Sequence, residues 1–159
     1  MKTLRQLKGN TPADIVANAQ KTSVYAIKMA HKKDKHLDTL VIYAKGMHAA
    51  TDKIEYDLEI ELYPSEVHQD VFKRPGLDSP CVVRCTCPYF HYYVRHALMK
   101  VGSTVIRNDK FEKGALEPPL ITNPRQIPYL CKHLYRASDK VIQATEVYLR
   151  RVKEVKFVK

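Results

Sequence analysis

The sequence lacks a long apolar run. Its longest uninterrupted apolar stretch, Leu40 to Ala44, is far shorter than the roughly 20 residues that cross a bilayer, so we expect no membrane span. The first residues, Met1 to Lys8, lack the apolar centre of a secretory signal, so we expect a reducing cytoplasmic setting. No internal repeat is apparent, and with 45% hydrophobic and 28% charged residues the 159-residue chain has the profile of one globular unit.

Acidic side chains are scarce after residue 80. The net charge is +10, from 27 Lys and Arg against 17 Asp and Glu, and nearly all of this excess lies in the second half of the chain. A one-sided basic field attracts polyanions such as DNA, or an acidic protein surface. The alternative is a solvated basic face that only keeps the protein in solution.

Cysteine is also scarce, and all four residues lie in the second half, at Cys81, Cys85, Cys87 and Cys131. Without export, disulfides are not expected, which leaves buried thiols, a reactive thiol or a metal site. Cys85-x-Cys87 and Cys131-x-His133 together make a set of four ligands that suits tetrahedral Zn²⁺. Because three thiolates and one imidazole fill the coordination sphere, we expect the zinc to be structural. The alternative is that the thiols are core residues and the histidine is solvated.

Other roles for these side chains have weaker support. Cys81 lies too far along the same strand face from the other thiols to share their ion, so a core thiol is expected. His91 and His96 are possible substitutes for His133, although their helical positions suggest ordinary, partly exposed histidines. A thiol-enzyme pair of Cys131 and His133 is disfavoured, since residues two apart on a helix face nearly opposite sides.

The first half of the chain predicts one short helix and three strands. Thr11 can cap a helix that starts at Pro12 and has Asp14 in its first turn. Period-two patterns then predict an antiparallel meander, with a loop over residues 31–36 and strands over Ser23–His31, Asp38–Lys45 and Ile54–Leu62.

The third of these strands carries a ladder of carboxylates, made of Glu55, Asp57, Glu59 and Glu61. Carboxylates on one strand can hold Mg²⁺ in a nuclease, but the lysine that accompanies them in such sites is absent here. We therefore expect the apolar face of this strand to be buried and its acidic face to be exposed to solvent.

The second half predicts a strand over Cys81–Cys87, a helix over Tyr89–Val101 with Gly102 as its cap, an extended piece over Ser103–Ile106 and a loop over Asn108–Pro124. The longest helix is expected from Pro128 onward. Its apolar positions step by three or four residues: Leu130, Leu134, Ala137, Val141, Ala144, Tyr148, Val152 and Val155.

The expected fold class is α+β, with a small antiparallel sheet, a zinc-stapled ββα-like module and a long C-terminal helix. Residues 1–80 hold the N-terminal helix and the meander, and residues 81–159 hold the zinc module with the basic helix, as parts of one compact unit. The candidates for binding nucleic acid or a partner protein are eight basic residues: Arg84, Arg95, Arg125, Lys132, Arg136, Lys140, Arg150 and Arg151.

The order Cys85-x-Cys87, insert, Cys131-x-His133 resembles the SWIM zinc finger, a family associated with binding DNA or other proteins, although the insert is longer than usual. The flanking segments, Cys85–Phe90 and Asn123–Leu134, resemble small proteins encoded by tailed bacteriophages. This resemblance implies a non-enzymatic, zinc-stabilised structural or assembly protein of the virion, made in the host cytoplasm and bound to other virion proteins. A SWIM-type nucleic-acid-binding protein is the alternative. Neither a membrane nor a small-molecule substrate is implied.

Overall fold

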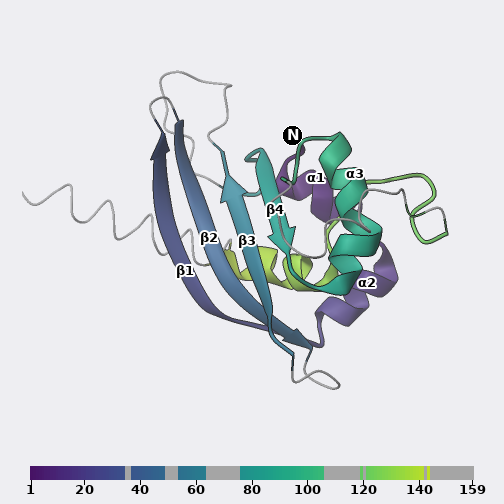
Figure 1. Cartoon of the computed structure of the whole chain (residues 1–159). Helices are drawn as coiled ribbons and strands as arrows, with labels where there is room; N and C mark the ends of the chain where they lie inside the picture. Colours follow the sequence, from purple (N-terminus) through teal and green to yellow (C-terminus); the bar gives the residue numbers. More distant parts are fainter. Residues whose placement is uncertain are drawn as a thin grey trace, which may run out of the picture.

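The computed structural model of the chain describes residues 1–34, 37–48, 54–63, 76–105, 119, 121–141 and 143. Its centre is an antiparallel sheet of four strands in the order β1-β2-β3-β4: β1 (Thr22–Asp34), β2 (Leu37–His48), β3 (Tyr56–Leu62) and β4 (Cys81–Cys85). Short helices gather beyond β4, and the yellow-green helix of the C-terminal half lies against one face of the sheet (Figure 1). The predicted α+β class is confirmed.

The meander of three strands is also confirmed, but the predicted loop over residues 31–36 is mostly strand. The backbone of β1 stays paired with β2 as far as Asp34, which lies opposite Leu37. β4 then pairs with β3, so that Cys85 lies opposite Leu58. β4, which ends at the predicted ligand Cys85, is therefore the fourth strand of the sheet whose other three strands come from the first half of the chain.

The N-terminal segment contains one helix more than predicted. Helix α1 (Leu4–Gly9) begins with a capping box, in which Thr3 Oγ1 accepts from the Gln6 N–H and the Gln6 side chain accepts from the Thr3 N–H. Helix α2 (Ala13–Ala19) forms where the sequence predicts it, but without the predicted cap. Thr11 instead donates its hydroxyl to the Leu7 carbonyl.

The segment after β4 is helical, as predicted, with an irregular first part. A π-helical segment, η1 (Phe90–Val94), continues into α3 (Arg95–Lys100). Gly102, at φ +66°, ends the helix, and the N–H of Ser103 reaches back to the Leu98 carbonyl at 2.9 Å. This pattern is that of a Schellman motif, which needs glycine at the left-handed position. Ser103 and Thr104 then lie beside β4, where the Val83 N–H donates to the Ser103 carbonyl, but they form a bend and not the predicted extended piece.

The C-terminal helix starts later than its apolar stripe predicts. Residues 132–141 are helical, and the Cys131 carbonyl accepts its first bond, from Tyr135. Residues 126–131 are not helical, because their backbone bonds to side chains of other segments. The stripe itself is buried as predicted at Leu130, Leu134, Ala137 and Val141, and its continuation from Ala144 lies outside the described residues.

One core cluster joins the inner face of the sheet to these helices. It includes Leu4 and Leu7 of α1, Ile42 and Ile60 of the sheet, and Leu134 of the C-terminal helix. Lys8 of α1 also bonds Asp139, and its Nζ lies 4.7 Å from the centre of the Tyr135 ring. The N-terminal segment therefore holds the C-terminal helix in place.

The acidic face of β3 differs from the prediction. Glu59 and Glu61 are buried, because each lies mid-sheet between a neighbour on β2 and one on β4. Glu61 accepts a hydrogen bond of 2.7 Å from the Tyr63 hydroxyl. Among the described residues, no helix is long and apolar enough to cross a membrane.

Candidate metal centre

Four buried donor atoms meet where β4 ends. The Sγ atoms of Cys85, Cys87 and Cys131 and a ring nitrogen of His133 all lie within 4.8 Å of one another. Nδ1 of His133 is 4.0 Å from Sγ of Cys85. Each of the four residues is at most 2% exposed. The structure thus brings together the four residues that the sequence predicts as ligands, and they form a cluster that could hold a metal ion.

The turn after β4 places Cys87 beside Cys85. Thr86 stays bonded to β3, since its N–H donates to the Asp57 carbonyl at 3.1 Å and its Oγ1 accepts from the Asp57 N–H at 2.9 Å. The N–H of Cys87 then points at Sγ of Cys85, 3.4 Å away, and the N–H of Phe90 points at Sγ of Cys87, 3.3 Å away. Backbone N–H groups aimed at sulfur stabilise the thiolate, the form that binds metal.

The loop before the C-terminal helix is fixed from two sides. The buried Asn123 side chain donates to the carbonyls of Ile127 and Tyr93, at 3.0 and 3.4 Å, and accepts from the Ile127 N–H at 3.0 Å. Further along, the Leu130 N–H donates to Thr11 Oγ1 at 3.2 Å. These bonds tie the loop to η1 and to the N-terminal segment, so the cysteine at 131 enters the cluster from a fixed position.

The imidazole of His133 lies against the sheet at a glycine. A Cβ added at Gly46 of β2 would lie 3.3 Å from Cβ and Cδ2 of His133 and 3.2 Å from Cδ1 of Leu58. Tyr56, which is paired with Gly46 in the register, holds its ring centre 4.9 Å from that of the imidazole. The lack of a side chain at Gly46 therefore makes room for the ring.

The cluster favours one thiolate among three sulfurs. Hydrogen bonds with the thiols of Cys131 and Cys85 hold the pKa of Cys87 far below its usual range. Burial raises the pKa values of Cys85 and Cys131. A second buried thiolate thus needs a compensating positive charge, which a divalent cation supplies.

The donor set fits a divalent metal ion. Thiolate and imidazole are the ligands that zinc takes in closed tetrahedral sites, and other soft divalent ions accept them as well. The fit is supported by the surroundings of His133, whose Nε2 has no hydrogen-bond partner among the described residues. The Nδ1 atom of His133 therefore has the thiols as polar neighbours, whereas its Nε2 atom has no hydrogen-bonding neighbour among the described residues. A buried imidazole in such surroundings is better suited to bind a metal than to remain an isolated polar group.

Cys81, His91 and His96 lie outside the cluster. Cys81 is a core thiol, as predicted, with its Sγ 3.5 Å from the Lys2 carbonyl, and burial raises its pKa to about 12. His91 is buried rather than partly exposed, since it packs inside η1 with Nδ1 at 3.4 Å from Nη1 of Arg95. His96 is half-buried. Neither histidine takes the place of His133 in the cluster.

The predicted basic residues do not form a single surface. Arg95 is only 4% exposed, because η1 and α3 turn it into the protein, so it is not available to a partner. Arg125 is exposed, and Arg84, Lys132, Arg136 and Lys140 are half-buried. Arg150 and Arg151 lie outside the described residues.

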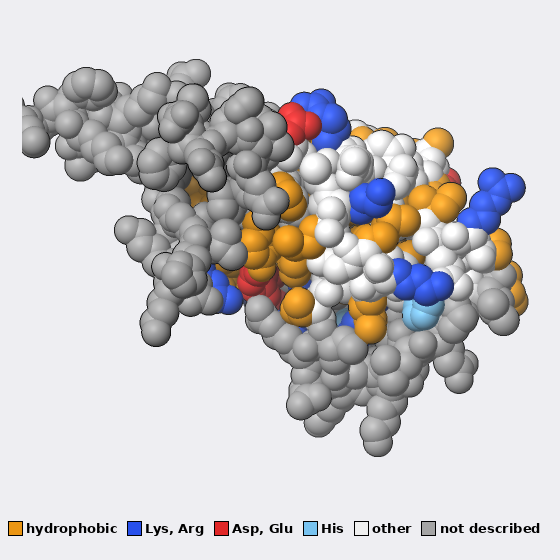
Figure 2. Space-filling view, turned by 90° about the horizontal axis from the view of Figure 1, so that it is seen from above, with side chains coloured by type: hydrophobic (Ala, Val, Ile, Leu, Met, Phe, Trp, Pro, Cys, Tyr) orange, Lys and Arg blue, Asp and Glu red, His pale blue; other side chains and the backbone are white. Residues whose placement is uncertain are grey.

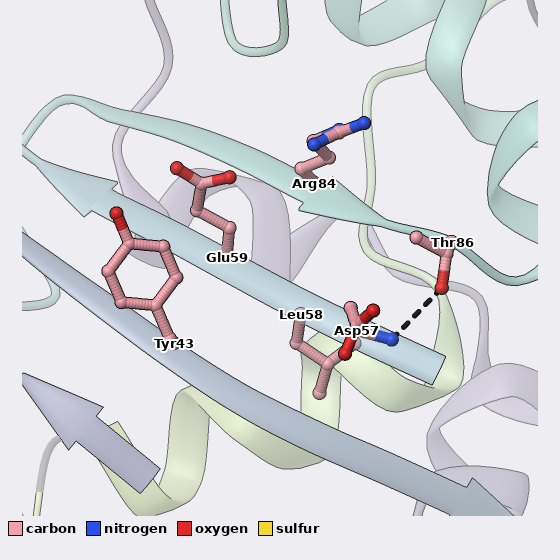
Figure 3. A pocket seen from close by; sticks show the side chains of 6 residues that line it. All are labelled: Tyr43, Asp57, Leu58, Glu59, Arg84 and Thr86. Carbon is pink, nitrogen blue, oxygen red and sulfur yellow. Dashed lines mark hydrogen bonds between the residues drawn. The ribbon is translucent and has the colours of Figure 1, made fainter. Parts of the chain in front are cut away.

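Asp57 and Glu59 of β3 border a polar hollow on the outer face of the sheet (Figure 3). Tyr43, Glu59 and Arg84 are paired across β2, β3 and β4, and their side chains rise from the same face. Asp57 and Thr86 lie beside them. Among the described residues, the acids make no group that could hold a metal, so nothing in this hollow supports the nuclease hypothesis.

Sequence reasoning missed three residues that support the centre, namely Gly46, Thr11 and Asn123. Only Gly46 has a recognisable signal, because an isolated glycine inside a strand often marks a close approach of another group.

Comparison with known proteins adds no family to this picture: no family model, no curated protein and no solved structure matches the chain.

Proposed function

We propose that the chain is a non-enzymatic protein whose Cys85, Cys87, Cys131 and His133 bind one Zn²⁺ in a closed, SWIM-like structural site. The observation that supports this most is the burial of all four donors. When bound, the ion would neutralise the thiolates and cross-link the segments that carry them. Because the four protein ligands would complete a tetrahedral sphere, the site would leave no position for water or substrate.

The location of the ligands explains why such a site would stabilise the fold. Cys85 ends β4 and Cys87 lies in the turn after it, whereas Cys131 and His133 lie at the start of the C-terminal helix. The metal would therefore join the sheet to a helix that is distant in sequence. Structural zinc contributes on the order of 10 kcal/mol to modules of this kind, so the loss of one ligand should be felt by the whole domain.

The proposed role is assembly, as a component of a tailed-phage virion that binds other virion proteins. Support comes from the resemblance of the segments around the four ligands to small phage proteins. It also comes from the loop that leads to Cys131, where Ile121 is 93% exposed and Ile127 is 41% exposed. A partner that covered these two side chains would remove their apolar surface from water.

The metal part of the proposal is tested by comparing Cys87→Ser with Cys81→Ser. Both changes replace a buried thiol, but only Cys87 belongs to the cluster. We expect one zinc per chain in the wild type and in Cys81→Ser, and loss of zinc with a large fall in stability in Cys87→Ser. Elemental analysis and urea unfolding measure both quantities. A wild type that is metal-free after zinc loading would contradict the proposal.

The assembly role is tested by quantitative mass spectrometry of purified particles, in which the protein should appear at a fixed copy number. The double variant Ile121→Asp, Ile127→Asp should keep its zinc and be absent from the particles. Detection of the protein only in the lysate of infected cells would refute the assembly role and leave the metal site untouched.

A further inference from the structure

A basic hollow lies where β1 begins, and none of the four metal ligands lines it. It has a volume of about 320 Å³ and is lined by Gln20, Lys21, Thr22, Ser23, Val24, Arg136 and Lys140. Three of these seven residues are cations and none is acidic. The first five form the junction between α2 and β1, whereas Arg136 and Lys140 come from the C-terminal helix. The packing of these two segments brings the three positive charges to one place.

The two helix cations share one side of their helix, since residues four apart are neighbours on a helix surface. The buried side of the same helix carries Leu134, Ala137 and Val141, which pack into the core. Arg136 and Lys140 therefore lie toward the outside while their stems remain half-buried. The positions of Arg136 and Lys140 at the hollow are therefore fixed by the packing of the opposite side of their helix into the core.

No carboxylate neutralises these cations within the described part of the chain. The nearby acid of the helix, Asp139, bonds Lys8 of α1 instead. Among the described residues, no Asp or Glu forms an ion pair with Lys21, Arg136 or Lys140. Three like charges around one hollow repel each other, and an anion in the hollow would remove that repulsion.

The hollow gathers three cations around one place. On the face shown in Figure 2, the Lys and Arg side chains stand apart from one another, and the one at the upper edge lies beside an acidic side chain. Of its seven described lining residues only Val24 is apolar, so these residues offer no large apolar group that would insert into a bilayer. Guanidinium, ammonium and the Ser23 hydroxyl are the donors that phosphate oxygens accept from.

We propose that this hollow binds phosphate groups of a nucleic-acid backbone. The proposal goes beyond the structural role of the metal centre and does not depend on the protein being a virion component. Because the hollow would bind phosphate rather than bases, binding should be independent of sequence and strongly dependent on salt.

The test uses the zinc-loaded full-length chain and fluorescence anisotropy of a labelled DNA duplex, measured over a series of salt concentrations. The variant Lys21→Gln, Arg136→Gln, Lys140→Gln should bind at least about tenfold more weakly at low salt, and its salt dependence should flatten by about one unit of log–log slope for each phosphate that the protein no longer neutralises. A control with the same change in net charge, Lys28→Gln, Lys32→Gln, Lys100→Gln, alters exposed cations elsewhere and should retain most of the affinity.

Each alternative has its own outcome. Equal losses of affinity in the two triple variants would mean that net charge alone drives binding, and would overturn the site. Binding of polyglutamate as tightly as DNA, or of anionic vesicles with no binding of DNA, would also overturn it, in favour of an acidic protein or a membrane surface. Zinc content measured on the same samples separates failure of this site from failure of the metal centre.

Discussion

Gly46→Ala tests the idea that the sheet leaves room for the His133 ring. The new Cβ would meet two atoms of that residue at 3.3 Å and Cδ1 of Leu58 at 3.2 Å. Both approaches are tighter than ordinary van der Waals contact, which lies at about 3.5–4.0 Å. Since Leu58 and His133 are both buried, neither can move away into solvent.

The magnitude is the difference of two terms. Overpacking of a core costs about 1–3 kcal/mol. Replacing a glycine inside a strand by alanine regains about 0.5–1 kcal/mol, because glycine loses more backbone entropy on folding. The net loss of stability should therefore be about 1 kcal/mol. If displacement of the His133 ring accounts for all of it, the apparent zinc affinity should fall roughly five- to tenfold, at about 1.4 kcal/mol for each factor of ten.

The assay is competition for zinc with a coloured chelator, together with urea unfolding of the zinc-loaded protein. Gly9→Ala is the matched control, because an added Cβ there meets nothing within 4 Å. It lies at the end of α1, where alanine favours the helix, so its stability should be unchanged or up to about 1 kcal/mol higher. A Gly46→Ala protein with wild-type zinc affinity and stability would refute the close approach of His133 to the sheet.

Three further predictions concern other parts of the molecule. Lowering the pH should release the metal, because protons compete with it for the three thiolates. The zinc content measured after dialysis at pH values from about 7 to 4 should fall cooperatively in the wild type, and in the same way in Cys81→Ser. Burial raises the pKa of the Cys81 thiol from 9.0 to about 12, so the stability that depends on the neutral thiol is full below pH 9 and is lost as the pH rises toward 12. By about pH 10.5 the free energy of unfolding of the wild type should therefore fall by on the order of 2 kcal/mol through this group, and urea unfolding of Cys81→Ala should not show this fall. Lys8→Met should cost about 1 kcal/mol by removing the partly buried ion pair with Asp139, and a double-mutant cycle with Asp139→Asn should show that the two losses are not additive.

The ligand set and the strands were determined by local sequence. Side chains alternate along a strand with a period of two, so the apolar pattern of β3 predicts its buried face without knowledge of the fold. The burial of Leu134 and Ala137 follows in the same way from the helical period. Three thiols and one histidine at these spacings are chemically sufficient to suggest one metal ion, and the structure brings them together.

Only the tertiary structure decided what surrounds those residues. Glu59 looks like a solvated acid on its own strand, yet neighbouring strands cover it on both sides. Arg95 looks like a surface cation, and the π-helical segment before it turns its side chain inward.

The same holds for contacts between distant segments. Thr11 has the local pattern of a helix cap, but its hydroxyl donates to the Leu7 carbonyl and accepts from the N–H of Leu130, which is distant in the sequence. Room for His133 at Gly46 and the meeting of Lys21 with Arg136 likewise depend on how α2, the sheet and the C-terminal helix pack. A sequence pattern describes each segment's own period, whereas these contacts are set by the geometry between segments, which no local pattern contains.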